Sequence, residues 1–138
     1  MIRFPLLLFF STFNLCIFAQ DISFIKETIN FNISNDTFNV YGKYTFQNKA
    51  GKIARQLVYY PINTSLDQLP YYKVSAIDSE SKKELFINKF ENYIVVPIEI
   101  KPYSKKNIII SYSQKIIDSS AVYILTTTKS WNLPLKKV

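Results

Sequence analysis

Apolar and polar side chains alternate with a period of two along most of the chain after residue 20. The clearest run begins at Phe38 and ends at Phe46, with Val40 and Tyr44 on the same side. Such alternation places every second side chain on one face of an extended chain, which is typical of a half-buried β-strand. No window after residue 20 keeps apolar residues three and four apart over a dozen positions, so no helix is predicted there.

The same pattern predicts eight short strands separated by polar turns. Their spacing of about ten residues is typical of an all-β antiparallel sandwich, immunoglobulin-like or jelly-roll-like. Residues 21–138 are enough for one such domain with its own core. The expected strands cover residues 25–33, 38–46, 53–62, 72–77, 84–90, 93–100, 107–116 and 121–128.

The turns and the chain end carry further expectations. Residues 48–52 read as a hairpin loop in which Gly51 takes a positive φ. Pro61 and Pro97 each predict a strand edge or a bulge. Because the chain has only two glycines, loops of three or more residues are favoured over two-residue turns. After Trp131 the sequence stops early, so either the last strand is short or the domain is truncated at its C-terminus.

The first twenty residues predict a secretory signal peptide. A basic start at Arg3 precedes an apolar run from Phe4 to Phe18, and Ala19 stands before a polar boundary. The run is shorter than the roughly 20 residues of a spanning helix. We expect cleavage after Ala19 or Gln20 and a secreted or periplasmic protein, with a retained membrane anchor as the alternative. Cys16, the only cysteine, follows Asn14-Leu15 rather than the small residues of a lipidation site.

Composition excludes several classes of chemistry. The chain has no histidine, and with Cys16 removed it has no thiol, which excludes Ser-His-Asp and Cys-His arrangements and the usual zinc sites. No glycine-rich phosphate loop occurs. We therefore expect no cofactor, no metal and no enzymatic activity. The alternatives are a hydrolase that uses two of Asp78, Glu80 and Glu84, and a calcium site to which Asp78 and Glu80 contribute.

The charge balance does not indicate a nucleic-acid partner. The formal net charge is +7, and removing residues 1–20 takes away only Arg3 among the charged residues. Arg55 is then the only arginine, and the lysine pairs 82–83, 105–106 and 136–137 fall in predicted turns or in the tail. Scattered lysines of this kind are typical of solvated loops rather than of a basic binding patch.

Two tyrosine pairs are the best binding candidates. Tyr59-Tyr60 ends one predicted strand and Tyr71-Tyr72 begins the next. Since neighbours on a strand point to opposite faces, one ring of each pair is expected to face outward. Outward rings on one sheet face would form a flat aromatic patch that stacks on a sugar or contacts a protein. The candidate binding residues are Tyr60, Tyr71, Tyr72 and Trp131.

A family resemblance spans Val40 to Gln114. It rests on Tyr44-Thr45-Phe46-Gln47-Asn48, on Leu57-Val58-Tyr59-Tyr60-Pro61-Ile62, and on Pro102-Tyr103-Ser104-Lys105-Lys106 before the strand Ile108 to Gln114. This order resembles uncharacterised secreted bacterial β-sandwich domains, and is similar to the N-terminal β-domain of zinc aminopeptidases and to vault-inter-alpha-trypsin domains. The zinc motif of the aminopeptidases is absent, so the resemblance implies an accessory, non-catalytic β-module.

These observations lead to one expected function and one alternative. We expect an exported, non-catalytic module that contacts a protein partner in the periplasm or envelope. The alternative is a carbohydrate-binding module that uses exposed tyrosine or tryptophan.

Processing of the N-terminus is directly testable. We expect the exported protein to begin at Gln20 or Asp21, because the boundary after Ala19 or Gln20 fits a cleavage site. N-terminal sequencing and intact mass of protein from the periplasm or the medium measure this. Recovery of Met1 in the membrane fraction would contradict cleavage, and uptake of labelled palmitate would contradict the reading of Cys16.

Overall fold

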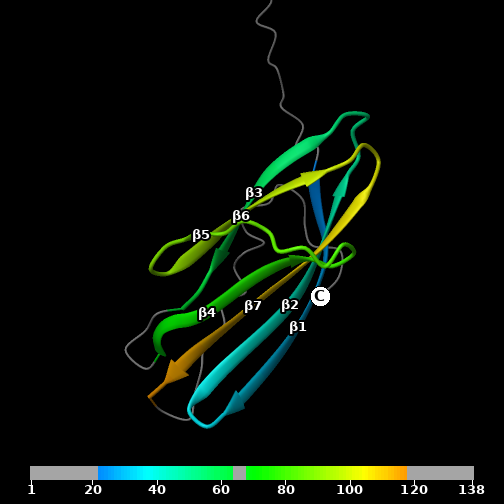
Figure 1. Ribbon diagram of the computed structural model, residues 1–138. Helices are drawn as coiled ribbons and strands as arrows, with labels where there is room; N and C mark the ends of the chain where they lie inside the picture. Colours follow the sequence, from blue (N-terminus) through cyan, green and yellow to red (C-terminus); the bar gives the residue numbers. More distant parts are fainter. Residues whose placement is uncertain (1–21, 64–67, 118–138) are drawn as a thin grey trace, which may run out of the picture.

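Seven strands form two antiparallel sheets in the computed structural model, which describes residues 22–63 and 68–117 (Figure 1). The four-stranded sheet has the order β1 (Ile22–Ser34), β2 (Thr37–Asn48), β7 (Lys105–Ile116) and β4 (Gln68–Asp78). The three-stranded sheet has the order β3 (Ala54–Pro61), β6 (Tyr93–Ile100) and β5 (Asn88–Lys89). The predicted all-β antiparallel sandwich is thus confirmed.

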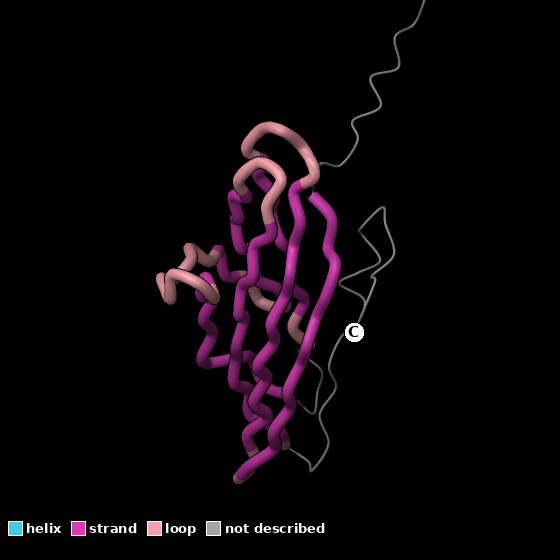
Figure 2. The backbone as a smooth tube through the Cα atoms, turned by 90° about the vertical axis from the view of Figure 1, so that its right-hand side faces the viewer, coloured by secondary structure: helices cyan, strands magenta, loops and turns pink. Residues whose placement is uncertain are grey.

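Every element of the described part is a strand or a loop (Figure 2). No helix in that part of the chain is therefore long and apolar enough to cross a membrane. The signal segment 1–20, the expected strand 121–128 and Trp131 lie outside the described residues.

The strand order differs from that of an immunoglobulin domain. There the fifth strand lies between the second and fourth, and the seventh lies beside the sixth. Here β7 occupies the place between β2 and β4, and the short β5 lies beside β6. The long β7 thus forms the centre of the four-stranded sheet, paired with β2 on one side and β4 on the other.

One buried cluster fills the space between the sheets. Alternate side chains of β2 and β7 face it from the four-stranded sheet, and alternate side chains of β3 and β6 face it from the other. Fully burying each large apolar side chain stabilises the fold by roughly 1.5–3 kcal/mol. The largest fully buried apolar members are Phe46, Tyr60, Ile62, Ile94, Ile100, Ile108 and Ile110.

Two tyrosines join the sheets at the centre of this core. The Tyr44 hydroxyl of β2 donates to the Tyr60 hydroxyl of β3 at 2.9 Å, and their rings meet edge to face at 5.6 Å between centroids. A buried phenol needs such a partner, because an unpaired hydroxyl in the core is costly. The Tyr44 ring lies over Gly42, where the missing side chain leaves room for it.

The predicted hairpin across residues 48–52 is wrong. β2 pairs with β1 and β7, whereas β3 pairs with β6, so this segment carries the chain from one sheet to the other. The completely buried side chain of Asn48 organises it: Nδ2 donates to the carbonyl oxygens of Lys52, Ile100 and Lys101 at 2.8–3.1 Å. Its Oδ1 accepts the Ala50 N–H at 2.8 Å. Gly51 does not adopt a positive φ.

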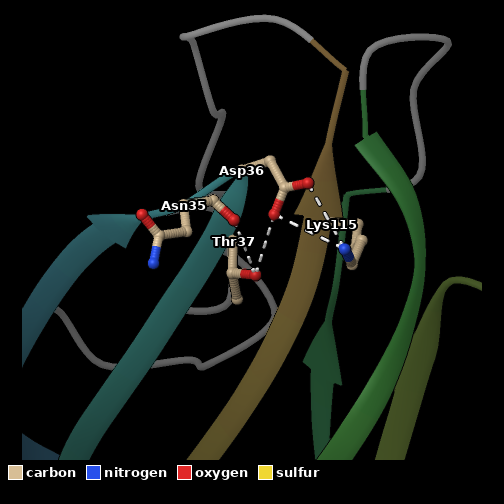
Figure 3. A network of polar contacts seen from close by, with 4 residues as sticks. All are labelled: Asn35, Asp36, Thr37 and Lys115. Atoms are coloured by element: carbon tan, nitrogen blue, oxygen red, sulfur yellow. Dashed lines mark hydrogen bonds and ion pairs between the residues drawn. The ribbon is translucent and has the colours of Figure 1, made fainter.

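The first hairpin contradicts the expectation of longer loops. Only Asn35 and Asp36 separate the paired residues Ser34 and Thr37, and their φ values are 47° and 60°. Positive φ at both positions defines the tight turn that matches strand twist, and Asn and Asp tolerate it well. Figure 3 shows the Asp36 carboxylate facing the Lys115 ammonium group of β7, with 3.3 Å between Oδ2 and Nζ.

Within residues 22–63 and 68–117, both prolines lie where a strand lacks a neighbour on one side, as predicted. Pro61 is the last residue of the edge strand β3. Pro97 pairs with β3, but β5 covers only Ile94 and Val95 on the other side of β6. The predicted strand 84–90 shrinks to β5, because residues 84 and 85 bond back to β4 before the chain reaches β6.

The space above Gly42 yields a stability test. A Cβ placed on Gly42 would overlap the Tyr44 ring, so Gly42→Ala is expected to destabilise the fold by about 1–3 kcal/mol despite the better strand propensity of alanine. Gly51→Ala is the matched control, since its Cβ would meet only the end of the exposed Tyr103 side chain, with the hydroxyl nearest at 2.8 Å, and this side chain can move aside. Equilibrium urea denaturation measures the free energy of unfolding of both variants. Equal values for Gly42→Ala and Gly51→Ala would contradict the predicted clash with Tyr44.

Candidate functional site

The tyrosine pairs divide between core and surface as alternation requires. Tyr60 is 1% exposed, whereas its neighbour Tyr59 is 56% exposed. The expectation of an exposed Tyr60 is therefore wrong, because its strand phase points it toward the core, where Tyr44 bonds it. Tyr72 is exposed, but Tyr71 packs against the core and donates its hydroxyl to the Phe90 carbonyl at 2.8 Å. Burial raises the pKa of Tyr71.

An aromatic face covers the outer side of the three-stranded sheet. Strand register places Tyr59 opposite Val95 and Leu57 opposite Pro97, and directly paired residues share a face. Tyr59 lies 6.3 Å from Tyr93 between ring centroids. We define this aromatic face by Leu57, Tyr59, Phe90, Tyr93 and Pro97.

The rings of this face are ordered by stacking. Phe90 and Tyr93 lie parallel within 8°, with centroids 4.4 Å apart. The loop that carries Phe90 is held by the Tyr71 hydroxyl and by the bond from the Phe90 N–H to the Tyr93 carbonyl. At the other end an ion pair joins Arg55 Nε and Glu99 Oε2 at 2.9 Å, beside a shallow hollow of about 370 Å³ that Leu57 and Pro97 also line. The result is an apolar centre with a charged rim.

A second surface lies on the outer side of the four-stranded sheet. We call it the cross-strand groove, a hollow of about 510 Å³ lined by three consecutive residues from each strand: 30–32 of β1, 39–41 of β2, 73–75 of β4 and 111–113 of β7. In each triplet the first and third side chains point to the outer face, and the middle one belongs to the opposite face. Val40 and Tyr112 are buried there, whereas Phe31 on the edge strand β1 stacks on Phe38 and stays 51% exposed. The groove therefore runs across the strands between two rows of side chains.

The acidic residues of the predicted turn do not come together as a site. Asp78 Oδ2 accepts a hydrogen bond from the Lys106 ammonium group at 2.7 Å. Its Oδ1 accepts hydrogen bonds from the backbone N–H groups of Glu80 and Ser81 at 3.0 and 2.9 Å. The Lys106 hydrogen bond, followed by the backbone bonds, holds the pKa of Asp78 well below its usual range. Glu80 and Glu84 are exposed. Among the described residues no three acids are grouped so that they could hold a metal ion.

Glu27 is a buried carboxyl group that the sequence alone did not single out. A bulge between Phe24 and Lys26 shifts the phase of β1, so that Glu27 faces the core opposite Tyr44. Its side chain is 2% exposed, and no group of the described chain hydrogen-bonds its Oε2. Burial raises the pKa of Glu27, because the charged form loses its hydration.

Comparison with known proteins supports the fold alone. No protein-family model matches the chain, and no curated protein matches it. A solved structure from Legionella pneumophila subsp. pneumophila, described as a "putative nutrient binding protein", is similar with a TM-score of 0.55 and 16% sequence identity. The match covers 69% of this chain and 40% of that one, so this chain spans less than half of that structure. The resemblance to aminopeptidase and vault domains stays a prediction.

Most residues of both surfaces were not predicted from the sequence. Tyr59 was predictable, because its neighbours Val58 and Tyr60 face the core and Tyr59 must then face outward. Tyr93 and Phe90 were not, since only pairing with β3 brings them beside Tyr59. The groove likewise depends on the register of four strands.

Glu27 predicts a pH dependence of stability. Below pH 4.5 the Glu27 carboxyl is protonated in both the folded and the unfolded state and does not affect stability. Because its pKa in the folded state is raised above 4.5, the free energy of unfolding falls as pH rises through that raised pKa. Glu27→Gln keeps the shape and removes the charge, so it should stabilise the protein at pH 7 by about 1–3 kcal/mol. Urea denaturation between pH 4 and 8 measures this. A variant no more stable than the parent at pH 7 would contradict it.

Proposed function

We propose that the protein is an exported, non-catalytic binding module that contacts a protein partner of the periplasm or envelope through the aromatic face. The observation that carries this proposal is the grouping of Leu57, Tyr59 and Phe90, each between 45% and 56% exposed, on one sheet face. Contiguous exposed apolar groups of this kind mark interaction surfaces.

The composition of the face suits a protein partner better than a small ligand. Stacked aromatic rings lose little side-chain entropy on binding and bury a large area, which makes Tyr and Phe common at interface centres. Arg55 and Glu99 stand at its border as a polar rim. An apolar centre bordered by charges excludes water from the contact while the rim selects the partner.

A non-catalytic role is supported by the side chains present. The chain has no histidine to act as a general base near neutral pH. Asp78, the acid of the predicted turn with a shifted pKa, is already bonded to Lys106 and two backbone groups. The neighbour described as a "putative nutrient binding protein" is compatible with a binding module.

The carbohydrate alternative cannot use the predicted tyrosines as a set. Tyr60 is in the core and Tyr71 is engaged with Phe90, which leaves Tyr72 as the exposed ring among the described candidates. Lys73 Nζ lies over the Tyr72 ring, 5.9 Å from its centre, and so competes with a sugar for that ring.

Paired substitutions on opposite faces test the proposed contact. The full chain, expressed in its own host, should recover a stoichiometric protein from envelope extracts, and the double variant Leu57→Ser/Tyr59→Ser should lose it by at least tenfold. Both side chains are exposed, so the free energy of unfolding should change by no more than about 1 kcal/mol. Tyr41→Ser, on the outer face of the other sheet, is the matched control and should retain the partner. Equal recovery by both variants would exclude the aromatic face as the contact.

A further inference from the structure

We propose that the cross-strand groove is a second binding site, for a short uncharged oligosaccharide, with Tyr41 as its stacking ring. This site is independent of the aromatic face, which lies on the other sheet.

The shape follows from strand register. One wall consists of Asn30, Tyr41, Ser111 and Ser75, and these four residues are register partners on adjacent strands. The other wall consists of Asn32, Asn39, Ser113 and Lys73 by the same register. Because neighbouring strands lie about 4.8 Å apart, the groove extends for about 14 Å across the sheet. It is therefore long and narrow, as a linear chain of sugar rings requires.

Each wall is fixed by a hydrogen bond between strands. The hydroxyl groups of Ser75 and Ser111 lie 2.8 Å apart in one wall, and the Ser113 hydroxyl donates to Asn39 Oδ1 at 2.7 Å in the other. A hydroxyl and an amide keep further donors and acceptors after one such bond. The walls thus present polar groups whose positions are set before a ligand arrives, which lowers the entropy cost of binding.

The lining is poor in charged side chains. Neither wall contains a carboxylate, so a cation has no oxygen ligand of that kind there. Among the described residues of the lining, Lys73 is the one basic group, at one end, where its Nζ lies 5.9 Å from the centre of the Tyr72 ring. The remaining outward side chains are amides, hydroxyls and one phenol. Such groups pair with the hydroxyls of a neutral sugar, and the 46% exposed Tyr41 offers an apolar ring to its C–H face.

A peptide fits this groove less well. Peptides that bind sheets usually add as a strand to an open edge. The backbone at the floor belongs in part to β2 and β7, which are paired on both sides and have no ladder groups left to offer. A ligand here must bind across the strands through side chains alone, and a polyhydroxylated chain is suited to that.

The experiment titrates the isotopically labelled full chain with neutral hexasaccharides of glucose, xylose and N-acetylglucosamine, and with an oligogalacturonate as the charged probe. We expect at least one neutral probe to shift the backbone amide signals of residues 30–32, 39–41, 73–75 and 111–113. Tyr41→Ala should weaken that binding at least tenfold, whereas Tyr41→Phe should retain it. Ser111→Leu, which fills the groove, should abolish it.

Tyr59→Ala on the aromatic face is the matched control and should bind as the parent does. Unchanged melting temperatures of all variants show that the fold is intact. Three results would overturn the proposal: no binding of any neutral probe, binding that survives Tyr41→Ala, or preference for the oligogalacturonate that disappears in Lys73→Ala. Loss of binding in Tyr59→Ala would also overturn it and would assign the sugar to the aromatic face instead.

Discussion

The buried amide of Asn48 fixes the way in which the chain passes between the two sheets. Its donor nitrogen bonds three carbonyl oxygens, one on the β2–β3 connection and two at the end of β6. The Asn48 N–H adds a bond to the Ser104 carbonyl of the β6–β7 connection at 2.9 Å. Because buried backbone carbonyls need partners, this one side chain allows two sheet-crossing loops to lie together at the same end of the sandwich.

Both outer surfaces depend on that crossing. Once β2 and β3 lie in different sheets, the core faces of both sheets are set by alternation, and so are their outer faces. The outer face of the four-stranded sheet carries amides and hydroxyls, whereas that of the three-stranded sheet carries rings. The Tyr44–Tyr60 contact joins the two sheets at the centre of the core, on the side to which strand phase directs Tyr60 and not Tyr59.

Several features were predictable because they are local. Alternation identified β2, β3, β6 and β7 nearly to their ends, and Pro61 and Pro97 correctly indicated open strand sides. The hairpin at residues 48–52 was mispredicted, because a polar loop containing glycine looks the same whether it joins paired strands or crosses between sheets. The sequence predicted a turn between residues 33 and 38, but not its two-residue length, because Asn35 and Asp36 adopt the positive φ that is usually assigned to glycine.

The sequence by itself determined that this is an all-β chain, which side chains alternate, and that histidine and thiol chemistry are absent from the part after Cys16. Only the tertiary structure decided which outward side chains become neighbours. Tyr59 meets Tyr93, and Tyr41 meets Ser111, through pairings between strands that are far apart in the sequence. The physical reason is that strand phase is a property of nearby residues, whereas register is set by the summed packing of all strands against one core.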